Sequence, residues 1–94
     1  MVSYAIRMDT TTKRTIANIR GVAKYYHRSN KNMAETTGIA VATYDRKINK
    51  TGAFTLLEFG AIADTLGVSP VDLMGKDLAE ILEELPELGN ARAA

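Results

Sequence analysis

Apolar side chains recur at three- and four-residue intervals along most of this 94-residue chain, the spacing that places them on one face of an α-helix. The pattern predicts helices over residues 12–27, 33–37, 41–49, 55–66, 70–75 and 77–85. Each predicted helix is short, and its ends are marked by capping residues, glycine or proline. The fold class expected from this pattern is all-α, a bundle of five to six short helices.

The clearest helix boundaries lie in the second half of the chain. Thr55 and Glu58 have the spacing of a capping box, in which each residue satisfies a backbone N–H of the other. Ser69 precedes Pro70, which is the order of a helix cap and a first helical residue. Gly67 and Gly75 end the two helices that these signals begin.

The two ends of the chain have patterns of their own. Val2, Tyr4 and Ile6 alternate with polar or small residues, which predicts a short strand-like arm over residues 1–10. A lone strand leaves its backbone groups unpaired, so we expect the arm to pair with the same segment of a second chain, or to dock on the domain or on a ligand. Residues 76–94 are expected to form an amphipathic helix and a frayed tail. The apolar stripe of this last helix, a second candidate for self-association, is Leu78, Ile81, Leu82 and Leu85.

Residues 30–48 have the pattern of two short helices joined by a tight turn. Gly38 stands where the turn needs a backbone conformation that a β-carbon resists, and Ala34 is small enough to let the second helix cross closely. Ile39, Tyr44 and Ile48 are spaced to face the core. This pattern favours a helix-turn-helix, although an ordinary corner between two helices has the same spacing.

Charge is distributed unevenly, although the net charge is only +1. Residues 1–50 contain ten basic and three acidic residues, a net of +7, whereas residues 51–94 contain two basic and eight acidic residues, a net of −6. Such segregation allows the basic half to face phosphates while the acidic half faces solvent or a partner. The alternative is that the basic side chains are ordinary solvated helix faces.

The composition argues against catalysis. The chain has no cysteine and one histidine, which excludes thiol nucleophiles, disulfides and zinc–thiolate clusters and leaves no nucleophile–base pair. We therefore expect no enzyme activity, cofactor, metal or small-molecule ligand. The apolar runs are too short for a membrane span, and the first residues lack the pattern of a secretory signal.

Four stretches of the sequence carry a resemblance to a known family. The last of them follows the pattern apolar-Ala-x-x-Leu-Gly-Val-Ser-x-x-x-Leu; the four are Met33–Ile39, Thr43–Ile48, Phe54–Phe59 and Ala61–Met74. From Ile16 to Met74 the chain resembles the lambda-repressor-like helix-turn-helix domain of phage repressors, Cro proteins and xenobiotic-response-element regulators. It departs from the family pattern at Ala40, where Ser or Thr is usual, and at Asn30, where Gln is frequent.

The resemblance implies that residues 11–75 are a DNA-binding domain whose helix over residues 40–49 lies in the major groove. It assigns four side chains to base edges, namely Val41, Ala42, Thr43 and Arg46. It assigns five to the phosphate backbone, namely Asn30, Lys31, Lys47, Asn49 and Lys50. Arg46 can donate two parallel hydrogen bonds to guanine, which is the side-chain chemistry that distinguishes this base.

The implied function is sequence-specific binding of double-stranded DNA by a Cro- or repressor-type transcriptional regulator that acts by occupying its operator. We expect it in the bacterial cytoplasm, or in the host cytoplasm if it is phage-encoded. A palindromic operator implies a homodimer, held by the arm (Val2, Tyr4, Ile6) or by the last helix (Leu78, Ile81, Leu82, Leu85). The alternative is an antitoxin, whose acidic half masks a protein partner while its basic half binds DNA.

Overall fold

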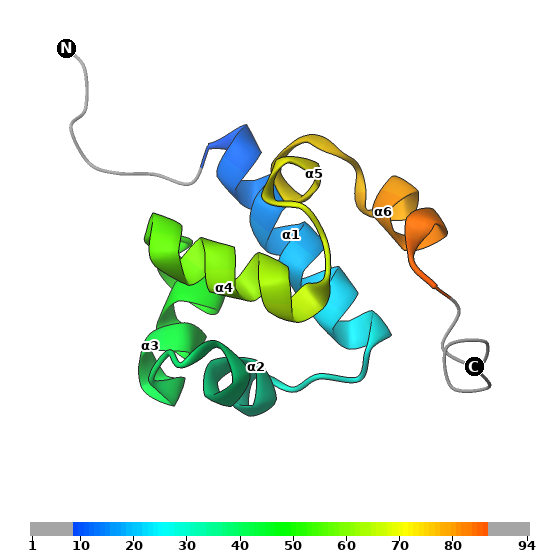
Figure 1. The fold of residues 1–94 in the computed structure, drawn as a ribbon. Coiled ribbons are helices and arrows are strands. Elements are labelled where there is room, and N and C mark those ends of the chain that lie inside the picture. Colours follow the sequence, from blue (N-terminus) through cyan, green and yellow to red (C-terminus); the bar gives the residue numbers. More distant parts are fainter. Residues whose placement is uncertain (1–8, 87–94) are drawn as a thin grey trace, which may run out of the picture.

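The structure is a computed structural model that describes residues 9–86 of the chain. Within this range it contains six α-helices, one π-helical segment and no β-strand (Figure 1). The elements are α1 (Thr10–Tyr25), α2 (Asn30–Thr37), α3 (Val41–Arg46), η1 (Lys47–Thr51), α4 (Leu56–Leu66), α5 (Pro70–Gly75) and α6 (Leu78–Glu84). The prediction of an all-α fold is confirmed for these residues.

The helix ends follow from local side-chain hydrogen bonds. The Asp9 carboxylate accepts from the Thr12 backbone N–H at 2.7 Å and thereby caps α1. Thr10 therefore belongs to the helix and not to the predicted arm, and residues 1–8 of the arm lie outside the described residues. The predicted capping box of Thr55 and Glu58 is present at the start of α4, and Ser69 caps α5 with Pro70 as its first residue. α6 stops at Leu85, whose extended backbone suits a residue that precedes proline.

Helix α1 runs through the middle of the molecule, with α5 and α6 on one side of it and α2 and α3 on the other (Figure 1). Ile19 and Val22 of α1 are completely buried. Every helix contributes to a single apolar core, whose buried members are Ile16, Ile19, Val22, Ala23, Met33, Ala34, Tyr44, Ile48, Ile62, Ala63, Leu66, Val68, Leu73 and Ile81.

One buried polar side chain connects α1 to α5. Asn18 is 1% exposed, and its Nδ2 donates to the backbone carbonyls of Leu73 at 2.8 Å and Lys76 at 2.7 Å. These two carbonyls belong to the end of α5 and the residue after it, where the helix leaves its last carbonyls without partners of its own. Asn18 thus satisfies the carboxyl end of a short helix from across the core.

The structure corrects the prediction that α6 is a free self-association stripe. Ile81 is 1% exposed and belongs to the core of its own chain, while Leu78 and Leu85 are half-buried against that core. A β-carbon on Gly21 of α1 would collide with the Leu78 side chain, so α6 packs directly on the backbone of α1. The prediction is therefore wrong for Ile81, because α6 needs its apolar face to cover α1.

Candidate nucleic-acid interface

Helices α2 and α3 are joined by the turn Gly38–Ala40. Ser29 caps α2 by accepting from the Asn32 backbone N–H at 3.0 Å. Gly38 ends α2 in the left-handed conformation, with φ of 80°, and the N–H groups of Gly38 and Ile39 both donate to the Ala34 carbonyl. A β-carbon is strained at this φ, which is the reason for glycine at this turn. Ala34 is completely buried, as expected for a residue at a close helix crossing.

Two large side chains hold α3 and η1 against the core. Tyr44 is 1% exposed and its ring packs on Phe54 with centroids 5.7 Å apart, while Ile48 is 2% exposed. Burial raises the pKa of Tyr44 to about 12, with the nearby Arg20 charge acting in the opposite direction. Tyr44 is therefore neutral at physiological pH, and it anchors one side of α3 so that the other side faces outward.

The outward side of α3 carries most of the residues that were assigned to base edges. Val41 is 40% exposed, and Ala42 and Arg46 are exposed. Ala42 and Arg46 line one shallow hollow together with Asp45, Asn49 and Lys50, which places the five on one face. Thr43 is half-buried and lines a different hollow, between the α2–α3 turn and α4. The structure thus groups Ala42 and Arg46 but turns Thr43 away from them.

The helix that was predicted over residues 41–49 is not α-helical throughout. It changes at Lys47 into the π-helical segment η1, which continues to Thr51 and ends at Gly52 in the left-handed conformation. No side-chain hydrogen bond caps its first residue, in keeping with Ala40 at that position. A π-helical segment adds an extra residue to a turn and is frequent at functional sites.

Two of the residues assigned to the phosphate backbone have partners within the chain. The Lys47 Nζ lies 2.6 Å from the Glu58 Oε1, and the Lys47 side chain is only 14% exposed. Asn49 accepts a hydrogen bond from Arg20 at 3.0 Å through its Oδ1. The Glu58 carboxylate at the start of α4 therefore holds the Lys47 ammonium, and the assignment of Lys47 to a phosphate contact stays a prediction. Asn30, Lys31 and Lys50 are exposed.

The hydrogen bond from Lys47 also sets the ionisation of Glu58. It lowers the pKa of this carboxyl, and the hydrogen bond from the Thr55 backbone N–H lowers it further. One carboxylate oxygen of Glu58 thus accepts hydrogen bonds both from the cap of α4 and from the first residue of η1.

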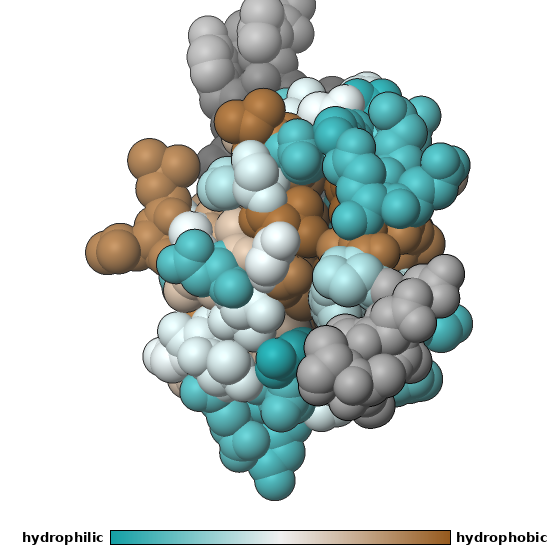
Figure 2. All heavy atoms as spheres, turned by 45° about the vertical axis from the view of Figure 1, so that its right-hand side comes forward, coloured by the Kyte–Doolittle hydropathy of each residue, from teal (hydrophilic) through white to brown (hydrophobic). Residues whose placement is uncertain are grey.

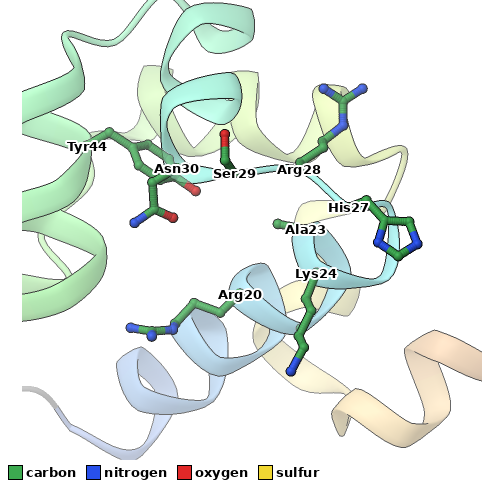
Figure 3. A pocket seen from close by; sticks show the side chains of 9 residues that line it. Arg20, Ala23, Lys24, His27, Arg28, Ser29, Asn30 and Tyr44 are labelled. Carbon is green, nitrogen blue, oxygen red and sulfur yellow. The ribbon is translucent and has the colours of Figure 1, made fainter.

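Sequence reasoning missed a basic hollow between α1 and the start of α2. Arg20, Lys24, His27 and Arg28 line it, with Ser29, Asn30 and Tyr44 on the α2 and α3 side (Figure 3). Its volume is about 690 Å³, and none of the described residues that line it is acidic. Arg20 and Lys24 are four residues apart, a spacing that places both on one face of α1 and that could have indicated the hollow.

The basic hollow adjoins the outward face of α3. Arg20 lines the hollow and donates to Asn49, which shares the shallow hollow of Ala42 and Arg46. Asn30 lines the basic hollow from the first residue of α2, where the backbone N–H groups of a helix favour an anion. The hydrogen bond from Arg20 to Asn49 therefore connects the basic hollow to the face of α3 that carries Arg46 and the acidic Asp45.

Comparison of the chain with protein-family models, with curated proteins and with solved structures gives no match. Among residues 9–86, no helix has both the length and the apolar character needed to cross a bilayer. The same residues contain no cluster of three or more histidine, aspartate or glutamate side chains that could hold a metal ion.

Proposed function

We propose that this chain is a transcriptional regulator of Cro or repressor type that binds double-stranded DNA through a lambda-repressor-like helix-turn-helix formed by α2 and α3. Helix α3 would enter the major groove, which is wide enough to admit an α-helix. The sequence resemblance supports this proposal, and the geometry of α3 is compatible with it.

The observation that carries the proposal is the two-sided character of α3. One side is fixed by the buried Tyr44, while Ala42 and Arg46 stand exposed on the other. Arg46 supplies the fork of donors that reads guanine, and the small Ala42 permits close approach to the base edges or contact with a thymine methyl group.

Phosphate contacts would supply most of the affinity. The basic hollow offers the side chains of Arg20 and Lys24, together with Asn30 at the start of α2. Such contacts position a protein on the duplex without reading its sequence. Because few side chains of α3 can discriminate bases, two copies on a palindromic operator would multiply the discrimination of one.

Selection of bound sequences from a random DNA pool tests the proposal. The parent chain is expected to select a two-fold symmetric motif, and Arg46→Ala is expected to lose one guanine from each half-site, a discrimination of about 1–3 kcal/mol. Lys50→Ala is the matched control, because it removes an exposed cation of the same face and should weaken all sequences alike.

Two results would contradict the proposal. If no sequence of the pool is enriched at any salt concentration, the proposal of DNA binding is wrong. An Arg46→Ala variant that selects the parent motif with unchanged information would remove the base contact assigned to Arg46.

A further inference from the structure

An apolar groove lies on the flank where α1 begins. Phe54, Leu56, Phe59 and Met74 line it together with Ile16 of α1, and the first turns of α1 form its rim. The volume of the groove is about 200 Å³. A cavity of about 150 Å³ accommodates a benzene ring, so the groove has room for a large apolar side chain.

The side chains around this groove are unusually exposed for their type. Leu56 is 89% exposed and Met74 is 40% exposed. Figure 2 shows apolar side chains that protrude from one edge of the molecule. Covering such side chains would be favourable by about 25 cal/mol for each Å² of apolar surface removed from water, so the groove is suited to an apolar occupant.

The sequence supplies an occupant whose attachment point is beside the groove. Residues 1–8 join α1 at Asp9, and Thr11 and Thr12 already line the groove. A segment of seven residues spans at most about 25 Å when extended, which is enough to reach along a groove that begins two residues away. Val2, Tyr4 and Ile6 alternate with small or polar residues, so an extended segment would present them on one side.

We propose that this groove is the docking site for the apolar side chains of residues 2–8 of the same chain. The short connection decides between this segment and a second copy, because a tether of a few residues gives an effective concentration in the millimolar range. A second copy at micromolar concentration competes poorly with it. The docked segment shields Leu56 and Met74. Val2, Tyr4 and Ile6 then contact their own chain and not a second copy. Docking of this segment does not depend on DNA binding.

Thiol labelling tests the docking, because the natural sequence contains no cysteine. A bulky thiol reagent is expected to modify Met74→Cys at least about tenfold more slowly in the full chain than in a chain that also carries Tyr4→Ser and Ile6→Ser, the factor that corresponds to about 1.4 kcal/mol of docking free energy. Leu57→Cys is the matched control. Leu57 is 86% exposed and does not line the groove, so its rate should be the same in both backgrounds.

Each alternative outcome overturns the proposal. Equal labelling rates at Met74→Cys with and without the two serine substitutions would show that the segment does not cover the groove. Protection that increases with protein concentration would show that another copy covers it. The helix content and thermal midpoint of each variant, measured in parallel, exclude unfolding as the cause of faster labelling.

Discussion

At the scale of single residues, Asn18 has the largest predicted effect on stability. Its side chain is buried, and its two hydrogen bonds satisfy carbonyls at the end of α5. Asn18→Ala is expected to lower the free energy of unfolding by about 3 kcal/mol, because it removes two hydrogen bonds and leaves a buried and a partly buried carbonyl without a donor. Asn32→Ala, which removes only an exposed bond with Arg28, should cost about 0.5 kcal/mol or less. Urea unfolding of both variants measures the difference, and equal costs would contradict this role of Asn18.

Glu58 gives a second prediction at this scale, concerning pH. Its pKa in the folded chain lies below the ordinary 4.5 because of Lys47 and the Thr55 N–H. A carboxyl with a lowered pKa stabilises the fold above its unfolded-state value, and that contribution is lost as the pH falls through the folded-state value. We expect Glu58→Gln to be less stable than the parent at neutral pH, and the gap to close below about pH 4.5. Unfolding midpoints measured from pH 7 to pH 3 test this, and a constant gap would contradict it.

At the scale of elements, the contact of α1 with α6 depends on a glycine within a helix. Alanine at position 21 would favour α1 by about 1 kcal/mol through helix propensity alone, but its β-carbon would collide with Leu78. Overpacking of this kind costs about 1–3 kcal/mol. Gly21→Ala is therefore expected to destabilise the parent by about 1 kcal/mol.

The sign of this effect should reverse when Leu78 is shortened. In a Leu78→Ala background the collision is absent, and Gly21→Ala should stabilise the chain by up to about 1 kcal/mol. A double-mutant cycle by thermal or urea unfolding measures the coupling. Equal effects of Gly21→Ala in the two backgrounds would show that α6 does not press on α1 at this point.

At the scale of the whole molecule, cations of the basic hollow and a cation outside it should differ in their effect on the salt dependence of DNA binding. For the proposed DNA complex, the double variant Arg20→Gln/Lys24→Gln is expected to have a shallower salt dependence. The slope of the logarithm of the DNA-binding constant against the logarithm of the salt concentration should decrease in magnitude by about 1.8, since each phosphate contact contributes about 0.9. The selected DNA motif should stay the same. Lys76→Gln removes the same type of charge from a site where the lysine pairs with Glu84, and should leave the slope unchanged. Fluorescence anisotropy over a salt series measures both, and equal slopes for all variants would exclude the hollow from the DNA contact.

Much of the fold could be predicted from the sequence because the signals are local. The capping box of Thr55 and Glu58 joins residues three positions apart, and Gly38 ends α2 through the conformation of one residue. The apolar spacing that placed Tyr44 and Ile48 in the core acts over a single helix. Local signals of this kind survive in any tertiary context that permits the helix.

The candidate site was predicted only in part, since its details depend on residues far apart in the chain. Lys47 is held by Glu58, 11 residues later, and Asn49 is bonded to Arg20, 29 residues earlier. The helical spacing of apolar residues gives no indication of either contact. The basic hollow was missed for the same reason, because it depends on how α1, α2 and α3 come together.

The sequence alone determined that the chain is helical and where α4 and α5 begin, because caps and prolines act on neighbouring backbone groups. It also determined that Tyr44 and Ile48 face inward and that the basic residues gather in the first half of the chain. The tertiary structure decided which of those basic residues are available. In the folded chain Lys47 pairs with Glu58, the face of α1 that carries Arg20 and Lys24 lies beside α2, and Ile81 packs against α1. Long-range pairing of this kind depends on which surfaces meet when the core closes.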